Sequence, residues 1–266
     1  MFLLSQIADY NVSTLIVLSV LAFVAGFIDS VVGGGGLIQI PALLISFPDT
    51  PLATLFGTNK IAALSGTSVA AYQYSRRVKY NYALLLVVSF FAFVASNLGA
   101  KALSHLNANT LKPVIFVILI LIAVYTFIKK DLGKIQTKTL SFGKQAVFGS
   151  LLGFTVGFYD GFFGPGTGSF LVLGFVVILG FEFMAASAYA KVINCVTNVS
   201  ALIVFIRHGN YMLALAILMA VCNISGSIIG SRMAIKRGNS FIRNIFLVIV
   251  IIMIVRYGYD IIRYSY

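Results

Sequence analysis

Charged residues are scarce in this sequence, and tryptophan is absent. Only 10% of the 266 residues are charged and 60% are apolar, whereas a soluble domain has about 25% charged and about 45–50% apolar residues. The mean hydropathy of +1.01 is spread over the whole length and exceeds what the interior of a globule of this size holds. The composition therefore excludes an ordinary soluble enzyme and predicts an all-α polytopic membrane protein in a lipid bilayer.

Cysteine and histidine are also rare, with two residues of each. Cys195 and Cys222 lie inside apolar stretches, so neither a disulfide framework nor a paired-cysteine metal site is expected. No arrangement of serine, histidine and aspartate predicts nucleophilic catalysis, and no ATP-binding motif is present. We therefore expect no cofactor, no metal and no enzymatic activity.

Acidic residues are outnumbered by basic ones, 7 to 19, which gives a formal net charge of +12. The cations lie mostly in short loops between apolar spans, so we interpret them as topology signals and expect no nucleic-acid partner. Asp9 and no cation precede the first apolar run, and no small-residue cleavage site follows it. The first helix is therefore expected to be retained.

An internal repeat organises the chain. When the sequence is shifted so that Gly26 lies on Gly157, Gly26-Phe27-Ile28-Asp29 aligns with Gly157-Phe158-Tyr159-Asp160. This shift is here called the repeat offset. The repeat offset also pairs Gly33 with Gly164, Lys60 with Lys191, Arg76 with Arg207, Tyr80 with Tyr211, Ser96 with Ser227, Gly99 with Gly230 and Lys112 with Arg243. One constant offset predicts two homologous halves. These are an N-terminal transmembrane repeat at 1–130, a basic linker at 131–142 and a C-terminal transmembrane repeat at 143–266.

Each half has the pattern of a long first helix, a glycine-rich break and a short apolar segment, followed by three longer spans. We expect the first helices at 12–31 and 143–162 and the short segments at 37–47 and 168–180. The longer spans are expected at 53–74, 81–101, 112–128, 184–206, 211–232 and 243–262. A segment of about 11 residues, at about 1.5 Å per residue, cannot cross a hydrocarbon core of about 30 Å. It is therefore interpreted as a re-entrant half-helix, and the first one is expected to begin near Pro41.

Loop cations distinguish two topologies. If each broken segment doubles back, the halves are inverted and the loops carry 12 cations on one side and 4 on the other. If the first helix and its break make a single crossing, the halves are parallel and the numbers are 10 and 6. The sharper asymmetry favours inverted repeats with both termini outside the cytoplasm.

The two glycine-rich breaks predict one central cavity. Non-helical backbone survives at membrane depth only where it is buried in protein or lines a wet space. Glycines let the backbone approach a ligand closely, and the start of a half-helix favours an anion. Alternatively, the glycines serve only close helix packing. The candidate residues at the breaks are Gly33, Gly34, Gly35, Gly36, Gly164, Gly166, Thr167 and Gly168.

Four ionisable residues lie within the predicted spans or at their ends, where such residues are functional candidates. Lys60 and Lys191 are interpreted as counter-charges for an anionic substrate. The neighbouring amides that would donate hydrogen bonds to it are Asn59, Asn194 and Asn198. Asp29 and Asp160 either form structural ion pairs with the lysines that hold the broken helices, or carry a coupling proton.

The run from Gly26 to Ile38 that continues into Pro41, followed by Thr58-Asn59-Lys60, resembles the sulfite exporter TauE/SafE family of membrane permeases. The runs 157–169 and 188–194 resemble the same family's repeated motif, so the resemblance covers nearly the whole chain. It implies a multi-pass permease of the bacterial inner membrane, with periplasmic termini under the inverted topology, that transports sulfite or a small organosulfonate. Thr167 stands where the first half has glycine, so the two half-sites differ and would suit a substrate with two different ends.

Together, the residues and the resemblance predict a secondary transporter for a small anion. The substrate would bind at a central site between the two repeats, which would give alternating access. The alternatives are an anion channel and, from another class, a membrane-embedded enzyme or assembly partner. The expected partners are the anionic substrate and the lipid bilayer, and a homodimer is left open.

Overall fold

All regular structure in the described residues is helical. A computed structural model describes residues 11–103, here called the N-terminal part, and 140–264, the C-terminal part. The N-terminal part contains α2 (Val12–Val32), α3 (Gly36–Ser46), α4 (Leu52–Ser75) and α5 (Tyr82–Leu103). The C-terminal part contains α7 (Phe142–Phe162), α8 (Thr167–Val177), α9 (Phe183–Arg207) and α10 (Leu213–Tyr264). The span expected at 112–128 and most of the linker at 131–142 lie outside the described residues.

The first helices and the half-helices lie close to their predicted positions. The bounds of α2 and α7 agree with the expected 12–31 and 143–162 within one residue, and α3 and α8 each contain 11 residues. The expected start near Pro41 was wrong, because α3 begins at Gly36 and contains Pro41 in its interior. The glycines, not the proline, set the start. The proline removes only the hydrogen bond to the carbonyl four residues earlier.

The two spans expected at 211–232 and 243–262 correspond to the two helical segments of α10, which meet at a kink. α10 runs through Leu213–Tyr264 and has non-helical geometry at Gly238, with φ 72° and ψ −162°. Glycine adopts positive φ without the steric cost that a Cβ would add. The polar stretch between the two expected spans therefore contains a sharp kink that joins two helical segments directly.

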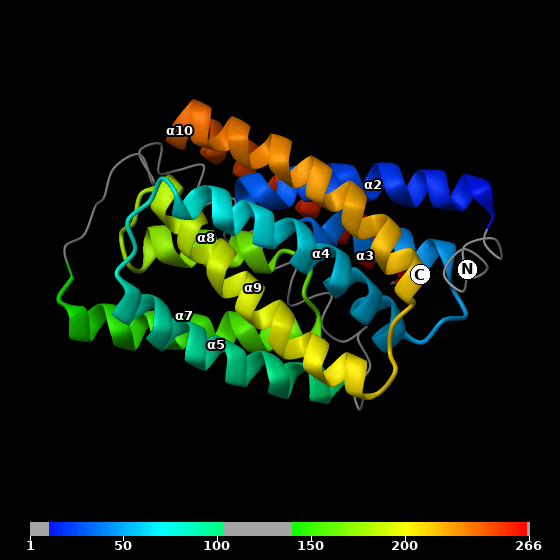
Figure 1. Ribbon diagram of the computed structural model, residues 1–266, viewed down its shortest axis with the longest axis horizontal. Coiled ribbons are helices and arrows are strands. Elements are labelled where there is room, and N and C mark those ends of the chain that lie inside the picture. The colour runs from blue at the N-terminus through cyan, green and yellow to red at the C-terminus, as the bar shows by residue number, and fades with distance from the viewer. Residues whose placement is uncertain (1–10, 104–139, 265–266) are drawn as a thin grey trace.

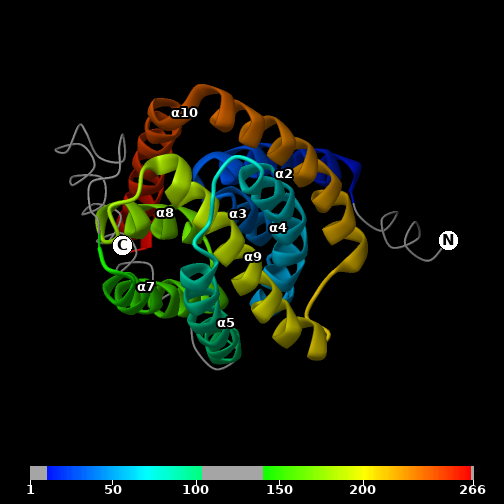
Figure 2. The ribbon, with the colours of Figure 1, turned by 60° about the vertical axis from the view of Figure 1, so that its left-hand side comes forward.

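Two outer helix pairs flank a central crossing (Figures 1 and 2). α2 packs along α10, α5 packs along α7, and α4 crosses α9 between these pairs. A Cβ on Gly57 of α4 would lie 3.1 Å from the side chain of Phe205 on α9. Ser68, further along α4, lies 3.7 Å from Cys195, which precedes Phe205 on α9. The central helices α4 and α9 are therefore antiparallel.

Glycines bring the outer pairs into backbone contact. A Cβ on Gly26 of α2 would lie 2.1 Å from the carbonyl oxygen of Asn223 on α10. A Cβ on Gly157 of α7 would lie 2.6 Å from the carbonyl oxygen of Ala92 on α5. Both contacts are too close for any larger residue, and the second pair repeats the first at the repeat offset. Equivalent positions in the sequence therefore make equivalent contacts in the fold.

The described helices have the length and surface of membrane spans. The four that are long and apolar enough to cross a bilayer are Val12–Val32, Tyr82–Leu103, Phe183–Arg207 and Leu213–Ile242. Large apolar side chains on the outer helices are exposed, among them Ile16, Leu86, Leu151 and Val221. Such a surface is stable against lipid and not against water. The chain is therefore a polytopic membrane protein.

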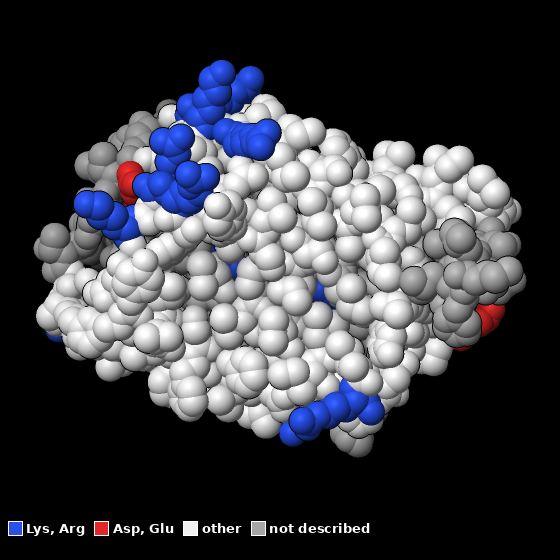
Figure 3. All heavy atoms as spheres, viewed as in Figure 1, with Lys and Arg blue, Asp and Glu red and all other residues white. Residues whose placement is uncertain are grey.

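Exposed cations gather at one end of the helices (Figure 3). This end includes the loop between α4 and α5, the start of α7 and the bend of α10, and its exposed cations are Arg76, Arg77, Lys79, Lys144, Arg232, Lys236 and Arg237. The opposite end, where α5 and α9 finish, has exposed Lys101 and Arg207. The described residues thus give the molecule one strongly basic end and an opposite end with few cations.

Candidate functional site

Two breaks in the helices create the site. Between α2 and α3, Gly33 and Gly34 have φ of 85° and 101°, and between α7 and α8, Gly164 and Gly166 have φ of 89° and 86°. These left-handed conformations are accessible to glycine and strained for other residues. The glycine-rich sequence therefore ends each first helix and starts each half-helix within a few residues.

The two breaks contact each other at the centre of the molecule. A Cβ on Gly33 would lie 2.3 Å from the backbone of Gly168, and the hydroxyl of Ser169 donates to the carbonyl oxygens of Val32 at 3.3 Å and Gly33 at 3.2 Å. Segments that are distant in the sequence are thereby held together, since Ser169 and Gly33 are 136 residues apart. The hydrogen bonds satisfy carbonyl groups that the end of α2 would otherwise leave unpaired.

The first buried ion pair connects α4 to the end of α7. Lys60 Nζ lies 2.8 Å from Asp160 Oδ2, and the two side chains are 5% and 3% exposed. The same ammonium donates to Asn198 Oδ1 at 3.2 Å, and the amide of Asn198 donates to Asn194 Oδ1 at 3.3 Å. The lysine therefore starts a chain of hydrogen bonds along α9.

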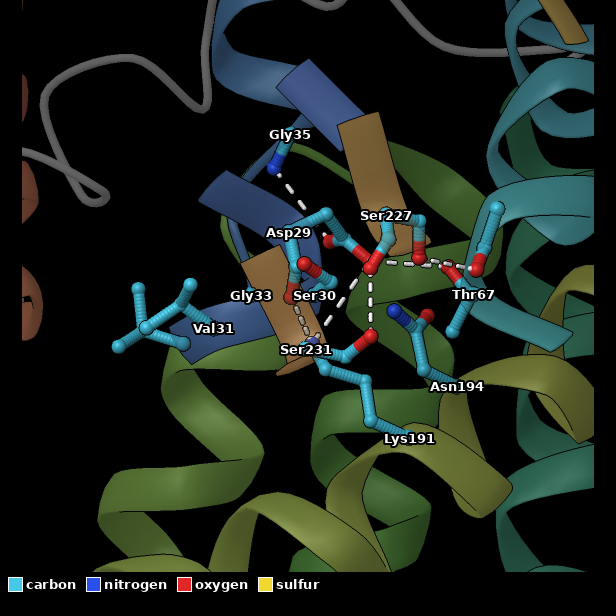
Figure 4. Close-up of polar contacts among 12 residues, drawn as sticks. Asp29, Ser30, Val31, Gly33, Gly35, Thr67, Lys191, Asn194, Ser227 and Ser231 are labelled. Carbon is cyan, nitrogen blue, oxygen red and sulfur yellow. Dashed lines mark hydrogen bonds and ion pairs between the residues drawn. The ribbon is translucent and has the colours of Figure 1, made fainter. Parts of the chain in front are cut away.

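The second buried ion pair connects α9 to the end of α2 (Figure 4). Lys191 Nζ lies 3.7 Å from Asp29 Oδ2 and also donates to the backbone carbonyl of Asp29. Asp29 accepts further hydrogen bonds from the hydroxyl of Thr67 at 2.9 Å and from the backbone N–H of Gly35 at 3.4 Å. This aspartate is therefore held from α4, from α9 and from the helix break.

The two ion pairs are related by the sequence repeat. Each lysine pairs with the aspartate that comes from the other part of the chain, and the partners exchange under the repeat offset. A further pair of hydrogen bonds follows the same rule: Ser96 donates to the carbonyl of Thr197 at 2.8 Å, and Ser227 to that of Gly66 at 2.6 Å. Figure 4 shows the second member of each relation, with Lys191 beside Asp29, and Ser227 close to Thr67, the residue that follows Gly66.

A narrow cavity of about 30 Å³ lies between the breaks. Its ionisable lining residues are Asp29, Lys60 and Asp160. Lys191 is fully buried and does not line this cavity. The equivalent lysines therefore differ: one reaches the cavity, and the other lies behind Asp29.

Most of the residues expected at the site line this cavity. They are Asp29, Gly34, Gly36, Asn59, Lys60, Asp160, Gly164, Gly166, Thr167, Gly168, Asn194 and Asn198. Gly33 and Gly35 do not line it, because Gly33 packs against Gly168 and Gly35 donates to Asp29. Thr167 donates its hydroxyl proton to the carbonyl of Gly164 at 2.7 Å, so it stabilises the break while it faces the cavity.

Four further lining residues were not expected from the sequence: Ile40, Phe56, Ala63 and Phe163. Phe56 lies four residues before Lys60 and Ala63 three residues after it, so helical spacing places all three on one face of α4. That spacing was a usable signal for Phe56 and Ala63. The apolar side chains give the cavity walls of low polarity beside its charged groups.

The helix starts and one amide give the cavity polar groups that can contact a ligand. Gly36 at the start of α3 and Thr167 and Gly168 at the start of α8 line it, so the positive ends of two helix dipoles adjoin the space. Asn59 is 5% exposed, and its Oδ1 has no hydrogen-bond partner among the described residues. An unpaired buried amide oxygen is destabilising unless a ligand or water occupies the site.

Within the described parts of the chain, no cluster of three or more histidine, cysteine, aspartate or glutamate side chains has the geometry to hold a metal ion. The polar side chains of the cavity are instead an ammonium, two carboxylates, three amides and the hydroxyl of Thr167. These groups bind through charge and hydrogen bonds.

Comparisons with known proteins agree with this architecture. Residues 18–257 match the family model for the sulfite exporter TauE/SafE. The chain is 38% identical over 240 residues to the probable membrane transporter protein ORF9 of Sinorhizobium sp., covering 90% of each protein. It is 33% identical over 253 residues to a probable membrane transporter protein of Haemophilus influenzae, covering 95% of this chain and 97% of that protein.

A third relative is the probable membrane transporter protein YfcA of Escherichia coli K12. It is 34% identical over 244 residues, which cover 92% of this chain and 89% of that protein. No solved structure matches the chain. The extent of the family match and the identity to these relatives show that the chain belongs to the sulfite exporter TauE/SafE family of membrane transporters.

Proposed function

We propose that this protein is a secondary transporter that moves a small anion through the cavity between its two repeats. The observation that carries the proposal is the position of Lys60, whose buried ammonium lines the cavity beside the starts of α3 and α8. An ammonium has three N–H donors, and Asp160 and Asn198 accept two of them. The third N–H, together with the helix dipoles, favours a bound anion.

The arrangement of equivalent helices supports inverted repeats. α4 and α9 occupy equivalent places in the two repeats and run antiparallel, as expected for halves that cross the membrane in opposite directions. Under the positive-inside rule, the basic end of the molecule faces the cytoplasm. The start of α2 lies at the opposite end, because α2 runs parallel to α10, so the N-terminus would be periplasmic in a bacterial inner membrane.

The way the repeats are connected supports alternating access. Each ion pair joins a broken helix of one repeat to the central helix of the other, and the two breaks contact each other through Gly33 and Gly168. A rigid-body movement of one repeat against the other would therefore change the surroundings of the cavity on both sides at once. The cavity would open to one side of the membrane at a time.

Sulfite and small organosulfonates are the proposed substrates. The family match and the anion-binding groups of the cavity both support this class. The two halves of the cavity differ, since Thr167 of the C-terminal part stands where the N-terminal part has Gly36. That difference suits a sulfonate with a second functional group at its other end.

Ligand-induced thermal stabilisation of the detergent-purified protein tests the proposal. The panel contains sulfite, thiosulfate, two- and three-carbon sulfonates and the matching carboxylates. A ligand at about 100 times its Kd that binds only the folded state adds about 2.7 kcal/mol. For a chain of this size, such a gain raises the melting temperature by roughly 5–11 °C. A selective rise with the sulfur anions is expected, and no rise with any anion contradicts the proposed substrate class.

Two double variants show where the anion binds. Lys60→Met with Asp160→Asn removes the ion pair at the cavity without leaving an unpaired charge, so we expect anion stabilisation to disappear. Lys191→Met with Asp29→Asn makes the equivalent change at the repeat offset, but Lys191 does not line the cavity. We expect this control variant to keep the anion-induced rise in melting temperature. Equal loss of anion stabilisation in both variants contradicts a specific role for Lys60. Saturation of the anion flux in proteoliposomes separates a transporter from a channel.

A further inference from the structure

The ionisable groups of the site are balanced before any substrate binds. Asp29, Lys60 and Asp160 line the cavity, and Lys191 lies behind Asp29 as its ion-pair partner. With both lysines and both aspartates ionised, the four charges sum to zero. A monovalent anion that enters this site adds one uncompensated negative charge. At membrane depth such a charge is costly, because low polarity strengthens the electrostatic energy of an unpaired ion.

The anion and Asp160 would share one cation. Lys60 Nζ is 2.8 Å from Asp160 Oδ2, so an anion that accepts the remaining N–H of Lys60 lies next to this carboxylate. Two negative groups that share a single ammonium repel each other, and a proton on one of them removes the repulsion. Asp160 is therefore the group at which binding of an anion and binding of a proton favour each other.

The two aspartates differ in how firmly their charge is held. The Asp29 carboxylate has three partners: the ammonium of Lys191, the hydroxyl of Thr67 and the backbone N–H of Gly35. For the Asp160 carboxylate, the hydrogen-bond partner among the described residues is Lys60. When an anion competes for Lys60, Asp160 loses its main source of stabilisation, whereas Asp29 keeps all of its partners.

We propose that Asp160 takes up one proton with each monovalent anion, so that the protein is an electroneutral proton–anion symporter. This inference rests on the proposed transport function. The proton comes from the aqueous phase on the side to which the cavity is open, binds a carboxylate oxygen of Asp160 and leaves with the anion on the other side. The charged groups that face Asp160 from the elements around the cavity are Lys60 of α4 and, across the space, Asp29 of α2.

Proteoliposomes that enclose a pH-sensitive dye in weak buffer test the proposal with ethanesulfonate as the probe. A sulfonate is a strong acid, so it neither crosses the lipid as a neutral molecule nor carries a proton of its own, as sulfite does. An inward ethanesulfonate gradient is expected to acidify the lumen by one proton for each anion taken up. A potassium diffusion potential of either sign is expected to leave this rate unchanged, because the coupled step moves no net charge.

Exchange of labelled ethanesulfonate at equal pH on both sides separates the two proposals. Exchange without acidification of the lumen under a gradient overturns the proton coupling and leaves the transport function in place. If the protein exchanges no ethanesulfonate at all, transport of sulfonates is overturned and the coupling with it. Both results come from the unaltered protein, so they do not depend on whether a variant folds.

Variants at two aspartates, one at the cavity and one at the surface, then identify the proton carrier. In Asp160→Asn the ammonium of Lys60 faces a neutral amide, so acidification is expected to fall to the level of empty liposomes. Exchange in this variant is expected to lose its dependence on pH. The matched control Asp49→Asn changes an exposed aspartate between α3 and α4 that does not line the cavity, so it is expected to keep about one proton for each anion. Acidification that persists in Asp160→Asn overturns the assignment.

Discussion

Replacing Lys191 with methionine is expected to destabilise the protein strongly, because the change leaves a buried aspartate without its counter-ion. Lys191 is fully buried, and the Asp29 side chain is 13% exposed. Removal of one partner from a buried ion pair costs about 3–5 kcal/mol. Thr67 and Gly35 still donate to Asp29, which keeps the carboxylate in place but supplies no opposite charge.

The loss of about 3–5 kcal/mol in the free energy of unfolding corresponds to a decrease in melting temperature of about 6–20 °C for a chain of this size. The measurement is thermal unfolding of the purified protein in one detergent, followed by the fluorescence of a thiol-reactive dye or by loss of soluble protein after heating. The exposed Lys79→Met is the matched control, and a surface change of this kind alters stability by no more than about 0.5 kcal/mol.

A second substitution separates lost charge pairing from lost packing. In Lys191→Met with Asp29→Asn no charge remains unpaired, and apolar replacement of a buried pair is often nearly neutral. Most of the melting temperature should therefore return. If Lys191→Met alone melts within about 2 °C of the unaltered protein, or if the double variant melts no higher than the single one, the ion pair does not hold α2 and α9 together in the way argued above.

Two further changes test contacts of the fold. Gly161→Ala would place a Cβ 1.9 Å from the carbonyl oxygen of Ser96, so the free energy of unfolding, measured by thermal unfolding, is expected to fall by about 1–3 kcal/mol. In the control Gly143→Ala on the same helix, the added Cβ meets nothing within 4 Å, so the free energy of unfolding should rise by up to about 1 kcal/mol. Thr58→Val removes the hydroxyl that accepts a hydrogen bond from the backbone N–H of Met212 at 2.9 Å, so the free energy of unfolding is expected to fall by about 1–3 kcal/mol. Unchanged melting of Gly161→Ala, or of Thr58→Val, would contradict the corresponding contact.

The sequence predicted the helices well because length, hydropathy and glycine act locally. The start and end of α2 and α7 follow from where an apolar run begins and where glycines permit positive φ, as at Gly33 and Gly164. The segment expected at 37–47 agrees with α3 within one residue, and only the expected start near Pro41 was wrong, since Pro41 is tolerated inside the helix. The break between the last two spans was predicted at 233–242, and the kink at Gly238 lies within it, although the structure has a kink there in place of a loop.

The pairing of charges was open in the sequence and depends on how the helices pack. Either lysine was a candidate partner for either aspartate, and the alternatives differ only in which helices cross at the centre. The packing of the helices at the centre brings Lys60 of α4 to Asp160 of α7, 100 residues away, and Lys191 of α9 to Asp29 of α2, 162 residues away. Spacing along the chain contains no information about contacts over such separations.

The amino-acid sequence by itself determined that the chain lies in a membrane, that it contains related segments at one constant offset, and that its helices break at glycine. These properties depend on composition and on the conformational freedom of single residues. Only the tertiary structure decided that Lys60 reaches the cavity while Lys191 lies behind Asp29. The two lysines are equivalent in the repeat, and their exposure to the cavity depends on the side chains that surround each of them after the helices have packed.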